Sequence, residues 1–180
     1  MNLSIGQGYM LASPLQVADM MAMIVNDGVI YEPHVVKEVL DPKTGAIISE
    51  IQPQVLLKTE ISPSTYQTVR EDLRNVIVHG TANVPINTKA VEIAGKTGTA
   101  EVGLKDHWHS WFVSFGPYNA KPQDQIVVVT MVEASNPWEW WGPYAADVIY
   151  QAIFANQTAE VAAKAVGISL HSTTVRGKIE

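Results

Sequence analysis

The chain has 180 residues, of which 47% are hydrophobic and 17% charged, a balance that suits one folded domain and excludes intrinsic disorder. Its formal net charge is −6, without blocks of like charge, so the sequence offers no basic surface for a nucleic acid. The absence of cysteine excludes disulfides, thiol catalysis and cysteine-ligated metal.

The first third of the chain is predicted to contain a helix and then a hairpin. Ser13-Pro14 is typical of a helix start, with serine as the cap and proline at the first helical position. Asn26-Asp27-Gly28 predicts the end of that helix. A strand is expected over residues 29–40, with a hairpin partner at 46–51. Residues 52–59 are expected to be extended.

Two further helices are expected. Ser62-Pro63 repeats the start signal and predicts a helix that runs to about Val78. Pro143 opens another helix, which completes the packed part of the chain. We therefore expect residues 1–155 to form one domain, and residues 156–180 to form a tail with a short helix that then frays.

Between these helices the sequence predicts three strands, over residues 91–102, 107–118 and 125–134. The short links between them favour antiparallel pairing, because a parallel crossover needs a dozen or more residues. Residues 126–129 are apolar on both faces, which predicts a central strand covered on both sides. The expected fold class is therefore α/β of the α+β kind, with an antiparallel sheet sandwiched by helices.

The strand over 91–102 carries the residues best suited to chemistry, Lys96-Thr97-Gly98-Thr99. Because side chains alternate along a strand, Thr97 and Thr99 share one face, where two hydroxyls can hold a carboxylate or carbonyl oxygen. Lys96 adds a positive charge, but alternation leaves the position of its ammonium open. The opposite face is small, so a helix is expected to pack against it. That face carries Ala94, Gly98 and Ala100.

A Lys-Thr-Gly triplet on a strand is one signature of penicillin-binding proteins and serine β-lactamases. Taken alone, the short pattern favours an ordinary strand with a solvated lysine. Other stretches occur around it in a fixed order: Gly6-Gln7-Gly8-Tyr9 leading to Ser13–Ala18, then Asn26–Gly28, Val78–Ala82, Ala94–Glu101 and Trp111–Pro117. Together they resemble the C-terminal half of the transpeptidase domain of class B penicillin-binding proteins, over roughly Asn2 to Ala155. The likeness is greatest to the elongation type, penicillin-binding protein 2.

This resemblance implies a β-lactamase/transpeptidase-like fold and a peptidoglycan D,D-transpeptidase that needs no cofactor. A serine of such an enzyme is acylated by D-Ala-D-Ala stem peptides or by β-lactams. The resemblance further implies that Thr97, Gly98 and Thr99 bind the terminal carboxylate. Lys96 would support the hydrogen-bond network that reaches the serine, and the backbone N–H of Thr99 would be an oxyanion donor.

The resemblance also implies a place on the periplasmic side of the cytoplasmic membrane, with the cell-wall elongation machinery as partner. No stretch of the sequence is long and apolar enough to span a membrane, and no signal peptide opens it. We therefore expect the membrane anchor to lie in a segment that is absent from this chain.

The sequence departs from the family pattern at its most important point. It contains no Ser-x-x-Lys and no Ser-x-Asn, and in the family both precede the Lys-Thr-Gly strand. We therefore expect a fragment that is incomplete on its N-terminal side, lacks the nucleophile and is inactive by itself. Apolar surface left bare by the missing segment would favour self-association.

Other interpretations stay open. A non-catalytic β-lactam sensor or scaffold of the same fold, a D,D-carboxypeptidase or a β-lactamase would share the Lys-Thr-Gly strand.

His107 and His109 could suggest a metal site, but no third ligand stands at a recognised spacing, and no metal is expected. A cluster of tryptophans is expected to anchor the last helix to the sheet, with a glycan or partner contact as the alternative. It consists of Trp138, Trp140 and Trp141.

Overall fold

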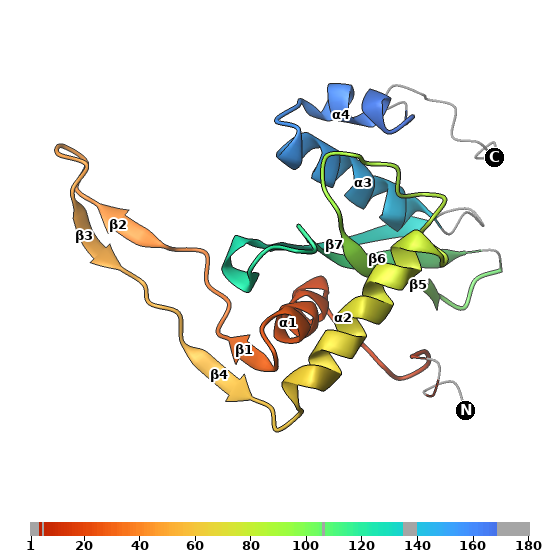
Figure 1. Cartoon of the computed structure of the whole chain (residues 1–180), viewed down its shortest axis with the longest axis horizontal. Coiled ribbons are helices and arrows are strands. Elements are labelled where there is room, and N and C mark those ends of the chain that lie inside the picture. The colour runs from red at the N-terminus through yellow and green to blue at the C-terminus, as the bar shows by residue number, and fades with distance from the viewer. Residues whose placement is uncertain (1–3, 5, 106, 135–139, 169–180) are drawn as a thin grey trace.

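The computed structural model describes residues 4, 6–105, 107–134 and 140–168 (Figure 1). Its helices are α1 (Pro14–Val25), α2 (Pro63–Val78), α3 (Trp141–Phe154) and α4 (Ala159–Ala165), with a short 3-10 helix, η2, at Pro122–Asp124. Its strands are β1 (Val29–Tyr31), β2 (Glu38–Leu40), β3 (Ile47–Glu50), β4 (Val55–Lys58), β5 (Ala94–Glu101), β6 (Trp108–Gly116) and β7 (Ile126–Ala134). This mixed architecture with antiparallel sheets confirms the predicted fold class.

Local sequence signals account for the first two helices. The side chain of Ser13 accepts the N–H of Gln16, and the side chain of Gln16 accepts the N–H of Ser13, which forms a capping box at the start of α1. Ser62 likewise caps the first turn of α2. Asp27 and Gly28 have positive φ angles, the conformation that commonly ends a helix. Both helices therefore begin and end where the sequence predicts.

The main sheet has the order β5-β6-β7, and all its pairings are antiparallel. The prediction that residues 126–129 form a central strand is wrong for the part of the chain that the structure describes, where β6 is central and β7 lies at an edge. Coverage on both faces is nevertheless correct. Val127 and Val129 pack toward α1, and Ile126 and Val128 pack toward α3. Apolar residues on both faces of a strand indicate that both faces of the sheet are covered there, but they do not indicate whether the strand is central or at an edge.

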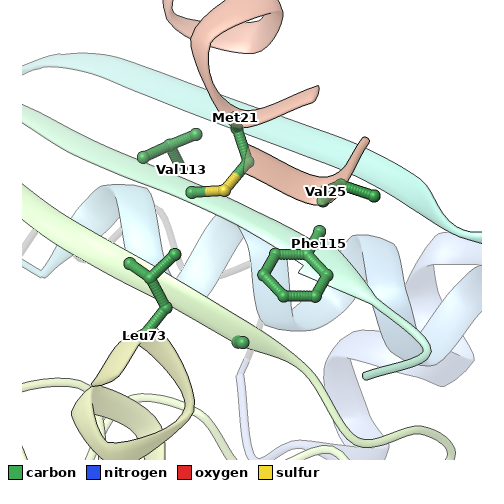
Figure 2. Close-up of a cluster of buried hydrophobic side chains, with 6 residues drawn as sticks. Met21, Val25, Leu73, Val113 and Phe115 are labelled. Carbon is green, nitrogen blue, oxygen red and sulfur yellow. The ribbon is translucent and has the colours of Figure 1, made fainter. Parts of the chain in front are cut away.

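Helices α1 and α2 cover one face of this sheet. Their contact is a cluster in which the side chains of both helices meet those of β5 and β6 (Figure 2). The buried members are Met21, Val25, Leu73, Ala94, Val113 and Phe115. Burial of these side chains supplies the main free energy that holds the two helices on the sheet.

Helix α3 covers the opposite face, and the end of α2 joins it there (Figure 1). The buried members of this second cluster are Ile77, Ala82, Ile93, Phe112, Ala146 and Tyr150. The Oγ of Ser110 accepts the N–H of Gly142, and the Oγ1 of Thr130 donates to the Gly142 carbonyl. The start of α3 is thus bonded directly to the middle of the sheet.

A long two-stranded arm projects from the body between α1 and α2 (Figure 1). In it β1 pairs with β4, and β2 pairs with β3. The hairpin partner at 46–51 and the extended segment 52–59 are confirmed as β3 and β4. The single strand predicted over 29–40 is wrong, because it breaks between Tyr31 and Glu38 around Pro33, which has no N–H to donate to a ladder.

No helix in the described part of the chain is long and apolar enough to cross a lipid bilayer.

Candidate active site

The edge strand β5 carries all the residues that the sequence selects for chemistry. Thr97 is paired with Phe112 and Thr99 with Ser110, so both hydroxyls stand on the face of the sheet that α3 covers. Lys96 is paired with Val113, and its side chain leaves from the opposite face. Lys96 and Thr99 are exposed, and Thr97 is half-buried.

The ammonium of Lys96 has a defined position. Its Nζ donates to the backbone carbonyl of Thr97 at 2.8 Å, so the side chain curls around the outer edge of β5. The ammonium of Lys96, from one face of the sheet, and the hydroxyls of Thr97 and Thr99, from the other face, therefore meet at the same edge of β5. Alternation alone could not predict this, because a lysine stem is long enough to reach past the strand it stands on.

The direction of the Thr97 carbonyl also shows which way the backbone N–H of Thr99 points. In an antiparallel strand the N–H and C=O of one residue point to the same side, and that side alternates from residue to residue. Lys96 binds the Thr97 carbonyl from outside the sheet, so the N–H of Thr99, two residues on, faces the open edge as well. An acceptor lying along β5 would thus meet a backbone donor, two hydroxyls and a cation.

The small face of β5 is only partly covered by helices. Ala94 is fully buried in the cluster with α1 and α2. Gly98 and Ala100 are half-buried, and a Cβ built on Gly98 would meet the Cβ of Trp111 on the adjacent strand at 3.3 Å. Within the described residues, the expected packing of a helix on this face therefore holds at Ala94 and is wrong at Gly98.

Sequence reasoning missed one hydroxyl of the site. The Oγ1 of Thr81 lies 2.9 Å from the Oγ1 of Thr97, a hydrogen-bond distance, although the two residues are 16 positions apart. The stretch Val78–Ala82 contributes to the family resemblance, but nothing in the sequence connects it to the Lys-Thr-Gly strand. Only the fold reveals that the turn after α2 ends beside β5.

That turn is held from both sides. The side-chain amide of Asn83 donates to the carbonyls of Ile77 and Val78 at 3.3 and 2.6 Å, which closes the end of α2. On the far side, Asp147 of α3 accepts the N–H groups of Asn87 and Thr88 at 2.9 and 2.8 Å. A buried aspartate gives no signal in a helical pattern, so the sequence could not identify this anchor.

Burial is the main influence on Asp147. Its side chain is fully enclosed, and desolvation raises the pKa of its carboxyl above the ordinary value of 3.8, although the two backbone N–H groups and the charge of Lys89 act in the opposite direction. The carboxylate also provides an acceptor for the N–H of buried Thr88, which would otherwise lack one.

The histidines and tryptophans stand apart from this constellation. His107 precedes β6, and its Nδ1 contacts the carbonyl of Lys105, while His109 lies on β6 paired with Ala100. The part of the chain that the structure describes holds no group of three or more metal-ligating side chains. Trp140 and Trp141 are half-buried at the start of α3, which fits an anchoring role, and Trp138 lies outside the described residues.

A comparison with known proteins bears on this geometry. The sequence model of the penicillin binding protein transpeptidase domain matches residues 1–157 of the chain. The chain belongs to this transpeptidase family. The resemblance predicted over residues 2–155 is thereby confirmed, and the match covers every element from α1 to α3.

Several relatives of this transpeptidase chain carry the names MrdA or PBP2. The peptidoglycan D,D-transpeptidase MrdA of Haemophilus influenzae is 29% identical over 150 residues, 73% of this chain. A structure of Pseudomonas aeruginosa PBP2 in complex with WCK 5153 is 34% identical, with a TM-score of 0.64 over 85% of this chain and 32% of that one. The PBP2 of Helicobacter pylori, solved in complex with MreC, is 26% identical, with a TM-score of 0.59 over 83% of this chain and 25% of that one.

The matched region is a minor part of these relatives. It spans 22% of the length of the Haemophilus protein. The transpeptidase family's Lys-Thr-Gly strand is present in it as Lys96-Thr97-Gly98, whereas Ser-x-x-Lys and Ser-x-Asn occur nowhere in the 180 residues.

Proposed function

We propose that this chain forms the carboxylate-binding wall of a peptidoglycan D,D-transpeptidase. The observation that carries the proposal is the convergence at the open edge of β5, where the Lys96 ammonium lies on the Thr97 carbonyl and the hydroxyls of Thr97 and Thr99 share the other face. The D-alanine carboxylate of a stem peptide, or that of a β-lactam, fits an edge that offers a cation and hydroxyl donors.

The arrangement supports a separate role for each of these residues. Thr97 and Thr99 donate hydroxyl hydrogens to the carboxylate, and Gly98 between them leaves room for the ligand to lie close to the strand. The backbone N–H of Thr99 stabilises the oxyanion that forms when a serine attacks the substrate carbonyl. Lys96 keeps the site electropositive and supports the hydrogen bonds that reach that serine.

The attacking serine and its base must come from outside these 180 residues. Acyl transfer of this type needs an activated nucleophile within hydrogen-bond reach of a base, and the family supplies both from Ser-x-x-Lys and Ser-x-Asn. We expect these motifs in a segment that completes the transpeptidase domain over the side where Lys96, Gly98 and Trp111 stand on β5 and β6.

The relatives support a cellular setting for the enzyme. The Helicobacter relative was solved with MreC, which supports cell-wall elongation machinery as the partner here. Periplasmic action at the cytoplasmic membrane, through an anchor outside this chain, and a role in cell shape accord with the elongation type.

Acylation by a fluorescent penicillin tests this function. The 180-residue chain by itself should not be labelled on any serine, whereas the complete gene product that contains it should be labelled on a serine outside residues 1–180. Lys96→Ala in the complete protein should lower the second-order acylation rate by about 100-fold or more, because it removes the cation of the site. Lys121→Ala, at an exposed lysine before η2, is the matched control and should leave the rate unchanged.

Two results would contradict the proposal. Labelling that maps to a serine of this chain would place the nucleophile within residues 1–180, against the proposal. A complete gene product without Ser-x-x-Lys would favour the sensor or scaffold alternative. Product analysis with a stem peptide separates the remaining candidates, since a transpeptidase joins two peptides, whereas a D,D-carboxypeptidase releases D-alanine to water and a β-lactamase turns over the penicillin.

A further inference from the structure

In the part of the chain that the structure describes, the side chain of Thr81, which lies outside β5, is bonded to a hydroxyl of the site. Its Oγ1 lies 2.9 Å from the Oγ1 of Thr97. A threonine hydroxyl has one hydrogen to donate and two lone pairs to accept with. In a pair of hydroxyls, one therefore donates to the other, and the direction of that bond decides which hydrogen is left for a third group.

An anionic ligand selects one of the two directions. A carboxylate is an acceptor only, so Thr97 must give its hydrogen to the ligand and must then accept from Thr81. In that arrangement the Thr81 hydroxyl donates to Thr97 Oγ1, and the hydrogen of Thr97 points at the carboxylate. Hydrogen bonds arranged in such a chain strengthen one another.

The turn that carries Thr81 is built to hold it in place. Ala82, the next residue, is fully buried, and its N–H donates to the carbonyl of Val76. Asn83 then bonds the last carbonyls of α2, and Asp147 fixes the loop farther along. Thr81 itself is exposed, so its side chain is not part of the buried core that stabilises the fold.

We propose that Thr81 is a positioning residue of the carboxylate subsite, which acts by donating to Thr97 and so aiming the Thr97 hydrogen at the ligand. The inference rests on the proposed function, because it presumes that β5 binds a carboxylate. It goes beyond that function by assigning a role to a residue outside the Lys-Thr-Gly strand.

A double-mutant cycle on the complete gene product tests this assignment, with benzylpenicillin as the probe and the second-order acylation rate as the readout. Thr81→Val keeps the shape of the side chain and removes the donor, so it should lower the rate about 10-fold, because the hydrogen bond that orients the Thr97 hydroxyl is lost. Thr81→Ser should restore most of the rate. In a Thr97→Val background, Thr81→Val should have no further effect, because its action passes through Thr97.

Control measurements separate positioning from general damage. Thr68→Val removes an exposed hydroxyl that bonds within α2 and should change neither the rate nor the melting temperature, and Thr81→Val should leave the melting temperature unchanged too. An unchanged rate in Thr81→Val, or an equal loss in the Thr97→Val background, would overturn the role of Thr81 and leave the proposed function intact. A wild-type protein that benzylpenicillin does not acylate would overturn the proposed function itself.

Discussion

At the scale of single residues, the two glycines of β5 have different tasks. A Cβ on Gly95 would meet the Val113 carbonyl at 2.6 Å and the Cβ of Ser114 at 2.8 Å, both on the adjacent strand. A Cβ on Gly98 would meet only the Cβ of Trp111, at 3.3 Å. Gly95 therefore permits β5 and β6 to pair closely under the buried clusters, whereas Gly98 stands in a more open place.

This contrast predicts unequal costs for the same substitution. Gly95→Ala should lower the free energy of unfolding by about 2–3 kcal/mol, because backbone atoms must move to admit the methyl group. Gly98→Ala should change the free energy of unfolding by less than about 1 kcal/mol. The slight crowding against the Cβ of Trp111 is offset because alanine loses less backbone entropy on folding than glycine does. Chemical denaturation of the two variants measures both values, and a cost for Gly98→Ala equal to that of Gly95→Ala would refute the contrast.

At the scale of elements, α3 and the turn after α2 are joined through one carboxylate. Asp147 accepts the N–H groups of both Asn87 and Thr88, and the Oγ1 of Thr88 donates to the side-chain oxygen of Gln151, one helical turn farther along α3. These bonds fix the segment that runs from the end of α2 to the start of β5, and thereby the distance between Thr81 and the site strand.

Substitution of Asp147 should weaken this joint measurably. In Asp147→Asn the amide oxygen can accept one backbone N–H, but the amide nitrogen confronts the other, so the free energy of unfolding should fall by about 1–3 kcal/mol. Asp72→Asn, at an exposed position of α2, is the matched control and should be nearly neutral. Denaturant titration of both variants at neutral pH checks this prediction.

The pH dependence of the same pair of proteins has a definite sign. Burial raises the pKa of Asp147 in the folded chain above 3.8, so the folded carboxyl holds its proton more tightly than the unfolded one. The stability that wild type has over Asp147→Asn should therefore be largest below pH 3.8 and should decline as the pH rises from there through the raised folded pKa, above which it stays constant. Free energies of unfolding measured across this interval would refute the prediction if the difference grew with pH.

At the scale of the whole molecule, the described chain exposes much apolar surface. On the arm, Val35 is 102% exposed, Ile48 64% and Leu56 60%, and the arm supplies no member of either buried cluster. Two short strand pairs with open edges and apolar side chains are prone to pair with other chains. The arm is thus the part of the chain best suited to drive self-association.

Truncation of the arm tests this prediction. Replacement of residues 33–53 by Asn-Gly keeps the β1–β4 pairing and closes it with a tight turn. Sedimentation velocity over a concentration series should show weaker self-association of the truncated chain than of the intact chain, with little change in the unfolding midpoint. Equal association in both would assign it to another exposed surface, such as the outer side of α1 with Leu15 and Met20.

The sequence by itself determined the features that depend on near neighbours. Ser13 and Ser62 followed by proline marked the starts of α1 and α2, and alternation along β5 placed Thr97 and Thr99 on one face. Each of these features depends on residues only a few positions apart, so a local sequence pattern predicts it. The family, too, was evident from the order of short motifs.

Tertiary structure decided what depends on residues far apart in the chain. It placed β7 at the edge of the described sheet, brought Thr81 to Thr97 across 16 positions, and set Asp147 against a loop about 60 positions earlier. It also showed where the Lys96 ammonium lies. Such contacts arise when whole elements pack, because burial of the two apolar clusters fixes the elements in place and so selects which polar groups meet.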